Sequence, residues 1–154
     1  MLNLIRYEPG ARAELEGWAQ RLGIDVERMQ LVFLVELQGV PPAVDHAPGA
    51  VQLLQMRILA RRDDALTATV GPAELVLLEA WEPSRKGLET PPQRRLDALA
   101  QLLREECTLP FTLSMGIALP GIDGAAISYG SARTASRLGR ARDPQQQVFS
   151  YYDM

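Results

Sequence analysis

The chain is poor in the residues that build disulfides and metal centres. Its 154 residues include one cysteine, Cys107, and one histidine. A single cysteine excludes an internal disulfide and a cysteine-based zinc site within one chain. No apolar run approaches the length of a membrane span, and the first residues lack the pattern of a secretion signal. We therefore expect a cytoplasmic protein with no membrane partner.

The charge balance is close to neutral. Sixteen lysine and arginine residues stand against 19 acidic ones, which gives a net charge of −3. This argues against nucleic-acid binding by the chain as a whole, so any DNA contact needs a local patch or a segment outside this sequence. The 47% hydrophobic content is typical of a globular protein with one core. We expect one domain over residues 1–154, with an N-terminal helix and linker in 1–30 and the core in 31–154.

Helical and strand patterns alternate along the chain. Helices are expected at 11–22, 51–62, 90–107 and within 125–138, and strands at 31–38, 66–70, 74–80, 111–118 and 147–152. Thr90 and Gln93 form a capping box for the third helix, and Gly139 is placed to end the fourth. Alternation over 111–118 predicts a strand with one face more buried than the other. Helices interleaved around one sheet with a central hairpin predict an α+β sandwich of the ferredoxin-like kind.

A short turn joins the two strands of the expected hairpin. It reads Gly71, Pro72, Ala73, Glu74, Leu75, and it resembles the Gly-Gly-Asp/Glu-Glu-Phe hairpin of diguanylate cyclases of the GGDEF family. In active cyclases the third position is an acidic metal ligand, and here it is alanine. A methyl group cannot coordinate magnesium, and a proline offers no backbone N–H to a phosphate. The resemblance therefore implies a degenerate nucleotide-cyclase scaffold with no catalytic residue, metal or cofactor, so we expect the protein not to be an enzyme.

The last third of the chain carries a second resemblance. The segments FTLSMGIALPGIDGAAISYGSARTASRLGRA and VFSYYDM are similar to the GGDEF-like middle domain of bacterial transcription regulators of the sugar-diacid (CdaR and PucR) type. The matching residues are Ser114, Gly116, Ser128, Tyr129, Ala132, Ala135, Phe149, Tyr151, Tyr152, Asp153 and Met154. Near the N-terminus, the family phrase is matched at Ala19, Leu22, Gly23, Ile24, Asp25, Arg28 and Val35.

That family implies the organisation of a larger protein. Its middle domain lies between an N-terminal effector-recognition domain and a C-terminal helix-turn-helix that binds DNA. The resemblance implies a non-catalytic regulatory and dimerisation domain, excised from such a regulator, that contacts DNA only through the missing helix-turn-helix. The alternative is a sensor that binds a nucleotide or cyclic dinucleotide without reacting it.

Several residues that match the regulator family are of types that serve packing. Gly116 permits close approach of another backbone, and Ala132, Ala135 and Ser136 give a helix face small enough to press on a sheet. A tyrosine at the C-terminal end can bury its ring while its hydroxyl stays in water. We interpret these residues as keeping the fold.

Two glutamates are the only remnants of an acidic site. Glu36 takes the place of the metal-binding aspartate of active cyclases, and Glu74 matches the fourth letter of the hairpin motif. Carboxylates on adjacent strands could hold a divalent ion or share a proton. We favour the simpler interpretation, in which each one caps a strand or faces solvent.

The remaining candidates also have plain structural alternatives. His46 could be a base or a metal ligand, but a solvated loop position is favoured. Cys107, at a helix end, is most simply a small buried hydrophobic residue. We expect Trp18 and Trp81 to lie in the core or at a domain interface.

Four arginines lie together near the end of the fourth helix. Arg133, Arg137 and Arg140 share one helical face, and Arg142 follows. They could contact DNA phosphates, but a solvated face whose cations favour the C-terminal end of the helix dipole is the favoured interpretation.

Overall fold

The structure, a computed structural model, describes residues 29–42, 47–62, 66–81 and 92–153. Its centre is one six-stranded sheet with the strand order β2-β3-β1-β4-β6, to which β5 adds by pairing with β1. The strands are β1 (Met29–Leu37), β2 (Leu66–Thr69), β3 (Glu74–Trp81), β4 (Phe111–Met115), β5 (Leu119–Pro120) and β6 (Val148–Ser150). The helices are α3 (Ala50–Arg61), α4 (Gln93–Glu106) and α5 (Gly121–Arg142), and a 3₁₀ turn, η1 (Tyr151–Asp153), follows β6.

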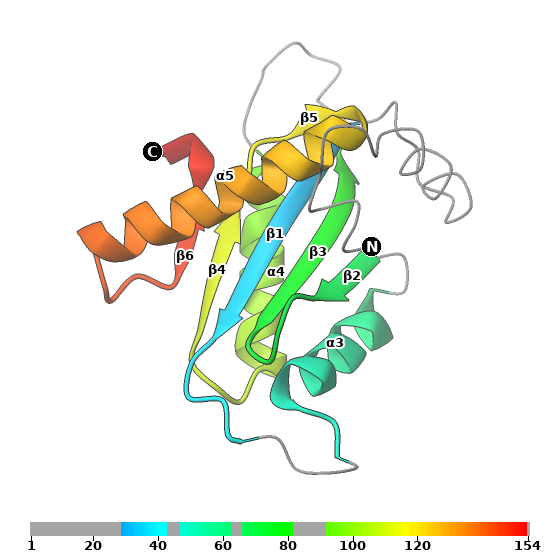
Figure 1. Ribbon diagram of the computed structural model, residues 1–154, viewed down its shortest axis with the longest axis vertical. Helices are drawn as coiled ribbons and strands as arrows, with labels where there is room; N and C mark the ends of the chain where they lie inside the picture. Colours follow the sequence, from blue (N-terminus) through cyan, green and yellow to red (C-terminus); the bar gives the residue numbers. More distant parts are fainter. Residues whose placement is uncertain (1–28, 43–46, 63–65, 82–91, 154) are drawn as a thin grey trace.

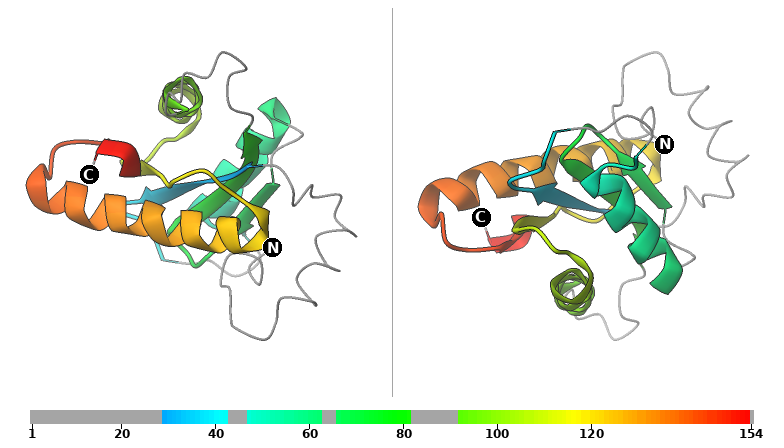
Figure 2. Two further views of the ribbon diagram at one scale, coloured as in Figure 1. Left: turned by 90° about the horizontal axis from the view of Figure 1, so that it is seen from above. Right: turned by 90° about the horizontal axis from the view of Figure 1, so that it is seen from below.

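The molecule has three layers. Helix α5 crosses one face of the sheet over β1 and β4, and α4 lies behind the opposite face (Figure 1). The view from above separates α4 and α5 on the two sides of the sheet (Figure 2). All pairings are antiparallel except that between β4 and β6. The predicted α+β sandwich with a mainly antiparallel central sheet is confirmed.

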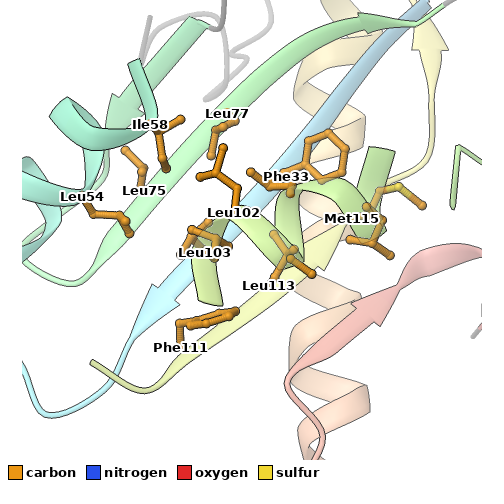
Figure 3. Packing of buried hydrophobic residues seen from close by; sticks show 14 of the residues in the cluster. Phe33, Leu54, Ile58, Leu75, Leu77, Leu102, Leu103, Phe111, Leu113 and Met115 are labelled. Carbon is orange, nitrogen blue, oxygen red and sulfur yellow. The ribbon is translucent and has the colours of Figure 1, made fainter. Parts of the chain in front are cut away.

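Strand β1 is the central strand because it is apolar on both faces. Residues 31–35 are at most 1% exposed, as expected for a strand covered on both sides. Successive side chains point to opposite faces, so Leu31, Phe33 and Val35 enter the core beneath α3 and α4. Figure 3 shows Phe33 in this core. The two helices add Val51, Leu54, Ile58, Leu96, Leu99, Ala100, Leu102 and Leu103 to this core.

The expected hairpin is present. Strands β2 and β3 pair in register from Leu66 opposite Leu78 to Thr69 opposite Leu75. The helix predicted at 51–62 is confirmed as α3, with Val51, Leu54 and Ile58 on its buried face. Together these segments place the hairpin between β1 and the edge of the sheet.

Strand β4 corrects one expectation. All five of its residues are buried, so both faces of the strand are covered, although the alternating sequence predicted one more exposed face. The reason is that α5 covers the second face. The strand also ends at Met115, before the predicted end at residue 118, and Leu119–Pro120 forms the short β5 against β1.

The helix predicted within 125–138 is longer at both ends. Helix α5 begins at Gly121 and continues to Arg142, and Gly139 lies inside it. A Cβ atom at Gly139 would lie 2.2 Å from Cδ1 of Phe149. The glycine therefore makes room for an aromatic ring, and the prediction that it ends the helix is wrong.

Helix α4 begins later than predicted. Its N-cap is Pro92 and no side chain caps it, so the predicted box between Thr90 and Gln93 does not start the helix. Thr90 itself lies outside the described residues. The apolar stripe of α4 and its end next to Cys107 are as predicted.

The last strand is short and forms an edge of the sheet. It covers only Val148–Ser150, within the predicted 147–152, because the chain turns into η1. The side-chain amide of Gln146 donates to the carbonyl oxygen of Val148 at 2.6 Å. Tyr152 is 37% exposed, and its hydroxyl accepts a hydrogen bond from the Ala118 N–H at 2.9 Å. The prediction of a buried ring with its hydroxyl in water is therefore wrong for Tyr152, whose side chain is exposed while its hydroxyl bonds the backbone.

None of the described helices is long and apolar enough to cross a membrane. The helix predicted at 11–22 lies outside the described residues, as do all N-terminal positions of the family match except Val35, which is buried in β1.

Candidate functional site

The hairpin tip is tied to the end of β1. Gly71 has a φ of 144°, a conformation that side chains other than glycine rarely adopt. The Val70 N–H donates to the carbonyl oxygen of Glu74 at 3.0 Å, and the Leu37 N–H donates to that of Ala73 at 2.8 Å. The tip therefore has a defined place beside β1.

Residues 72 and 73 of this tip offer no side-chain oxygen to a metal ion. Position 73 offers a methyl group, and Pro72, which is exposed, has no N–H to donate. The residues described by the structure contain no group of three or more histidine, cysteine, aspartate or glutamate side chains that could hold a metal ion.

Glu36 and Glu74 lie opposite each other on neighbouring strands. The antiparallel register of β1 and β3 pairs their Cα atoms directly, so the sequence was right to place the two carboxylates on adjacent strands. Like charges in this position destabilise a sheet unless something compensates them.

Helix α5 provides that compensation at Glu36. The Ser136 hydroxyl donates to Oε1 of Glu36, and Nη1 of Arg140 lies 3.4 Å from Oε2. The Glu36 side chain is 21% exposed. Both of its oxygen atoms contact α5, so Glu36 is a partly buried carboxylate with partners on the helix and does not simply face solvent.

Three of the four predicted arginines gather around Glu36. A recess of about 290 Å³, hereafter the arginine pocket, is lined by Leu34, Glu36, Arg133, Ser136, Arg137 and Arg140. Arg142 is exposed in the last turn of α5 and does not line the pocket. The shared helical face was predicted, but its neighbour, Glu36, was not.

Small residues hold the N-terminal half of α5 close to the sheet. A Cβ atom at Gly116 would lie 2.0 Å from the carbonyl oxygen of Ser128. The Ser128 hydroxyl accepts a hydrogen bond from the Val32 N–H at 2.9 Å, and that of Ser131 accepts one from the Ile117 N–H at 2.8 Å. The family positions Gly116 and Ser128 are therefore packing and hydrogen-bonding residues.

An ion-pair network on the opposite face escaped the sequence reasoning. Nη1 of Arg62, next to the end of α3, lies 2.6 Å from one carboxylate oxygen of Glu79, and Nη1 of Arg95 in α4 lies 3.0 Å from the other. Glu79 is 11% exposed. A glutamate within the apolar run of β3 was the signal that could have shown it, since a buried carboxylate requires partners.

Cys107 is half-buried and packs against the core. Burial raises the pKa of its thiol, and the pKa is lowered less by the hydrogen bond to the Leu109 carbonyl, at 3.2 Å, and by the charge of Arg57. A raised pKa disfavours the reactive thiolate, in agreement with the structural role predicted. His46 and Trp18 lie outside the described residues, as does the side chain of Trp81.

Comparison with known proteins agrees with this scaffold. Residues 8–138 match the family described as GGDEF-like domain. The carbohydrate diacid regulator of Escherichia coli (strain K12) is 32% identical over 155 residues, which cover all of this chain and 40% of the relative. The chain thus spans well under half of that regulator. Because the family match covers most of the sequence, and the sheet, hairpin and close-packed last helix agree with it, the chain belongs to the GGDEF-like domain family.

Proposed function

We propose that this chain is a non-catalytic regulatory domain of a sugar-diacid-type transcription regulator. In this role it contributes to dimerisation and couples effector sensing to a DNA-binding module outside the sequence. Its similarity to a carbohydrate diacid regulator supports the regulatory role. The coupling and dimerisation roles are those implied by the family resemblance.

The proposal that the domain is non-catalytic depends on the few oxygen ligands that the hairpin tip offers to a metal ion. Magnesium-dependent phosphoryl chemistry needs carboxylate or carbonyl oxygens free to hold the ion. The tip has a methyl group at Ala73, and the oxygens of Glu36 are bound by Ser136 and Arg140. Glu74 alone does not make a metal site of the required kind.

The natural full-length regulator offers the direct test. Incubated with GTP and magnesium or manganese, it should form no cyclic dinucleotide and consume no GTP, as followed by chromatography. Light scattering should give the mass of a dimer. Formation of a cyclic dinucleotide would overturn the non-catalytic role, and a monomer at all concentrations would overturn the dimerisation role.

A reporter gene tests the coupling. Cells carrying the full-length regulator should keep their response to the effector when Pro72 is replaced by alanine, because the tip performs no chemistry. The response should fall when Gly116 is replaced by alanine at equal protein level, because α5 can no longer pack on the sheet. Equal responses of the two variants would contradict a coupling role.

A second candidate is a sensor that binds a nucleotide without reacting it. The arginine pocket favours it, because guanidinium groups pair well with phosphates. Titration calorimetry with GTP and magnesium, and with a cyclic dinucleotide, tests it. Absence of both heat and a shift in melting temperature would count against this candidate.

A further inference from the structure

The outer side of helix α5 carries an apolar stripe that no described helix or strand covers. Two of its members are large side chains, Ile127 at 55% exposed and Leu138 at 43% exposed. Helix α5 lies against the sheet with one side, and its other side points away from the described elements (Figure 2). Exposed apolar side chains that share one face indicate an interaction surface. Hereafter, the α5 stripe consists of Ile127, Gly130, Thr134, Leu138 and Ala141.

The middle of the α5 stripe is shallow. A Cβ atom at Gly130 would have nothing within 4 Å. The Thr134 hydroxyl donates to the carbonyl oxygen of Gly130 at 3.0 Å. Because this bond satisfies the hydroxyl within the helix, covering Thr134 leaves no unpaired polar group. Another helix can therefore approach α5 closely at this point.

The α5 stripe is complementary to itself when it is turned end for end. Its residues follow one another at intervals of three, four, four and three, which is the same sequence of intervals in both directions. An antiparallel second α5 centred on Thr134 therefore places Ile127 opposite Ala141 and Leu138 opposite Gly130. Each large side chain then faces a small one, which is the arrangement that fills space between packed helices. A parallel copy would face large with large and small with small.

Charge selects the same orientation. The first turn of α5 contains Asp123, and its last turn contains Arg140 and Arg142. In the antiparallel arrangement Asp123 lies only three residues out of line with Arg142 of the second copy, about 4.5 Å along the axis. The two helix dipoles also oppose each other, which is favourable. A parallel arrangement would instead bring like charges together at both ends.

We propose that the α5 stripe is a dimer surface, on which a second copy of this chain packs antiparallel about a two-fold axis at Thr134. This surface deepens the dimerisation role proposed above and rests on it. The contact from residue 127 to residue 141 is about 21 Å long. One pair of helix faces of this length buries less than the roughly 800 Å² per partner of a standard interface. The contact is therefore weak alone, and other domains that hold two copies together strengthen it.

Cysteine crosslinking in the natural full-length regulator, with its native cysteines replaced by serine, tests the geometry. A short bifunctional maleimide should link two copies of the Thr134→Cys variant, because the axis places this residue beside itself. Ile127→Cys and Ala141→Cys should each link poorly to themselves. When these two variants are co-expressed with tags of different size, they should link to each other, because each faces the other across the axis.

A matched pair of substitutions tests the apolar contact. Leu138→Glu should raise the dimer dissociation constant about tenfold or more, because it buries a charge where an apolar side chain packed. Met56→Glu is the control, since Met56 is 63% exposed on α3, on the other side of the sheet. It should leave the constant unchanged. Analytical ultracentrifugation measures both variants, and melting temperatures show that both are folded.

The outcomes separate failure of this surface from failure of the dimerisation role. A full-length dimer in which Thr134→Cys does not crosslink, and in which Leu138→Glu and Met56→Glu have equal dissociation constants, would overturn the α5 surface and leave the dimerisation role standing. A monomer at all concentrations would overturn both. Crosslinking of Ile127→Cys to itself as efficiently as to Ala141→Cys would overturn the antiparallel arrangement.

Discussion

The two faces of the sheet are built from different kinds of residue. The face beneath α3 and α4 is packed with large apolar side chains such as Phe33, Leu77 and Leu103. The face beneath α5 combines the apolar strand residues Val32, Leu34, Val76 and Leu78 with serines, glycines and alanines and with the carboxylate of Glu36. Both faces are covered by helices, but the contacts that join helix to sheet are not of the same kind.

This difference separates two sources of order. Burial of large apolar side chains supplies a non-directional driving force, about 25 cal/mol per Å². Small residues bury less area, but they let a helix approach closely enough for its hydroxyl groups to bond the strand backbone. We infer that the α3 and α4 face mainly determines how stable the domain is, and that the α5 face mainly determines how the last helix is positioned.

Loss of a large side chain should have the largest effect. Phe33 is 0% exposed, and Phe33→Ala should lower the free energy of unfolding by about 3–5 kcal/mol through lost burial and an unfilled cavity. The control is Ile127→Ala, since Ile127 is 55% exposed and its replacement should change stability by about 0.5 kcal/mol at most. Urea unfolding measures both. Similar losses in the two variants would contradict the assignment of the main core.

The close approach on the α5 face can be broken by a single methyl group. Gly116→Ala should cost about 3 kcal/mol, because its Cβ would meet the backbone oxygen of Ser128 and neither chain can move aside cheaply. Gly130→Ala is the matched control, because nothing lies within 4 Å of a Cβ atom there. That change should stabilise the helix by up to about 1 kcal/mol. Thermal unfolding followed by circular dichroism should show opposite shifts for the two alanines.

Two buried serines allow the effect of a hydrogen-bonded hydroxyl to be compared with that of a hydroxyl without a partner. Ser128→Ala leaves the Val32 N–H without its acceptor and should cost about 1–3 kcal/mol. The Ser114 hydroxyl is buried with no hydrogen-bond partner, so Ser114→Ala should be neutral or slightly stabilising. Equal destabilisation by the two changes, measured by urea unfolding, would show that volume rather than hydrogen bonding holds this face.

The smallest effect concerns an exposed ion pair between α3 and α4. Nη1 of Arg61 lies 2.5 Å from Oε2 of Glu105. The hydrogen bond from Arg61, with smaller contributions from Gln101 and from the charge of Arg61, lowers the pKa of Glu105. A lowered pKa in the folded state gives stability above the unfolded pKa that is lost as the pH falls through the folded value.

The pH dependence of this pair can be isolated with one variant. Wild type should melt slightly above Glu105→Gln near neutral pH, and the difference should disappear in strong acid. Added salt should reduce it as well, because exposed pairs are screened. A difference that grows on acidification would be inconsistent with the lowered pKa.

The sequence predicted the elements whose signals are local. Strand β1 shows a continuous apolar run, α4 shows an apolar stripe, and the hairpin shows a turn between β-rich runs. The sequence also showed what residues 71–74 can do chemically, because the lack of a side-chain oxygen at Ala73 is evident without the tertiary structure. All of these predictions depend only on residues that are neighbours along the chain.

What the sequence could not predict depends on contacts between distant segments. Glycine is common where helices end, which is why Gly139 was predicted to end the helix. In the structure it instead makes room for the ring of Phe149. Glu36 gave no sign that Ser136 and Arg140, about a hundred positions away, would bind its carboxylate. Burial of both faces of β4 likewise follows from the position of α5 over the sheet, which no alternation pattern in β4 records.

The bond from Gln146 to Val148 has a consequence for assembly. Edge strands invite foreign strands because their outer amides and carbonyls are unsatisfied. Here the domain covers one of those carbonyls with its own side chain, and the chain leaves the strand after three residues. A partner molecule therefore finds little free backbone with which to extend the sheet along β6.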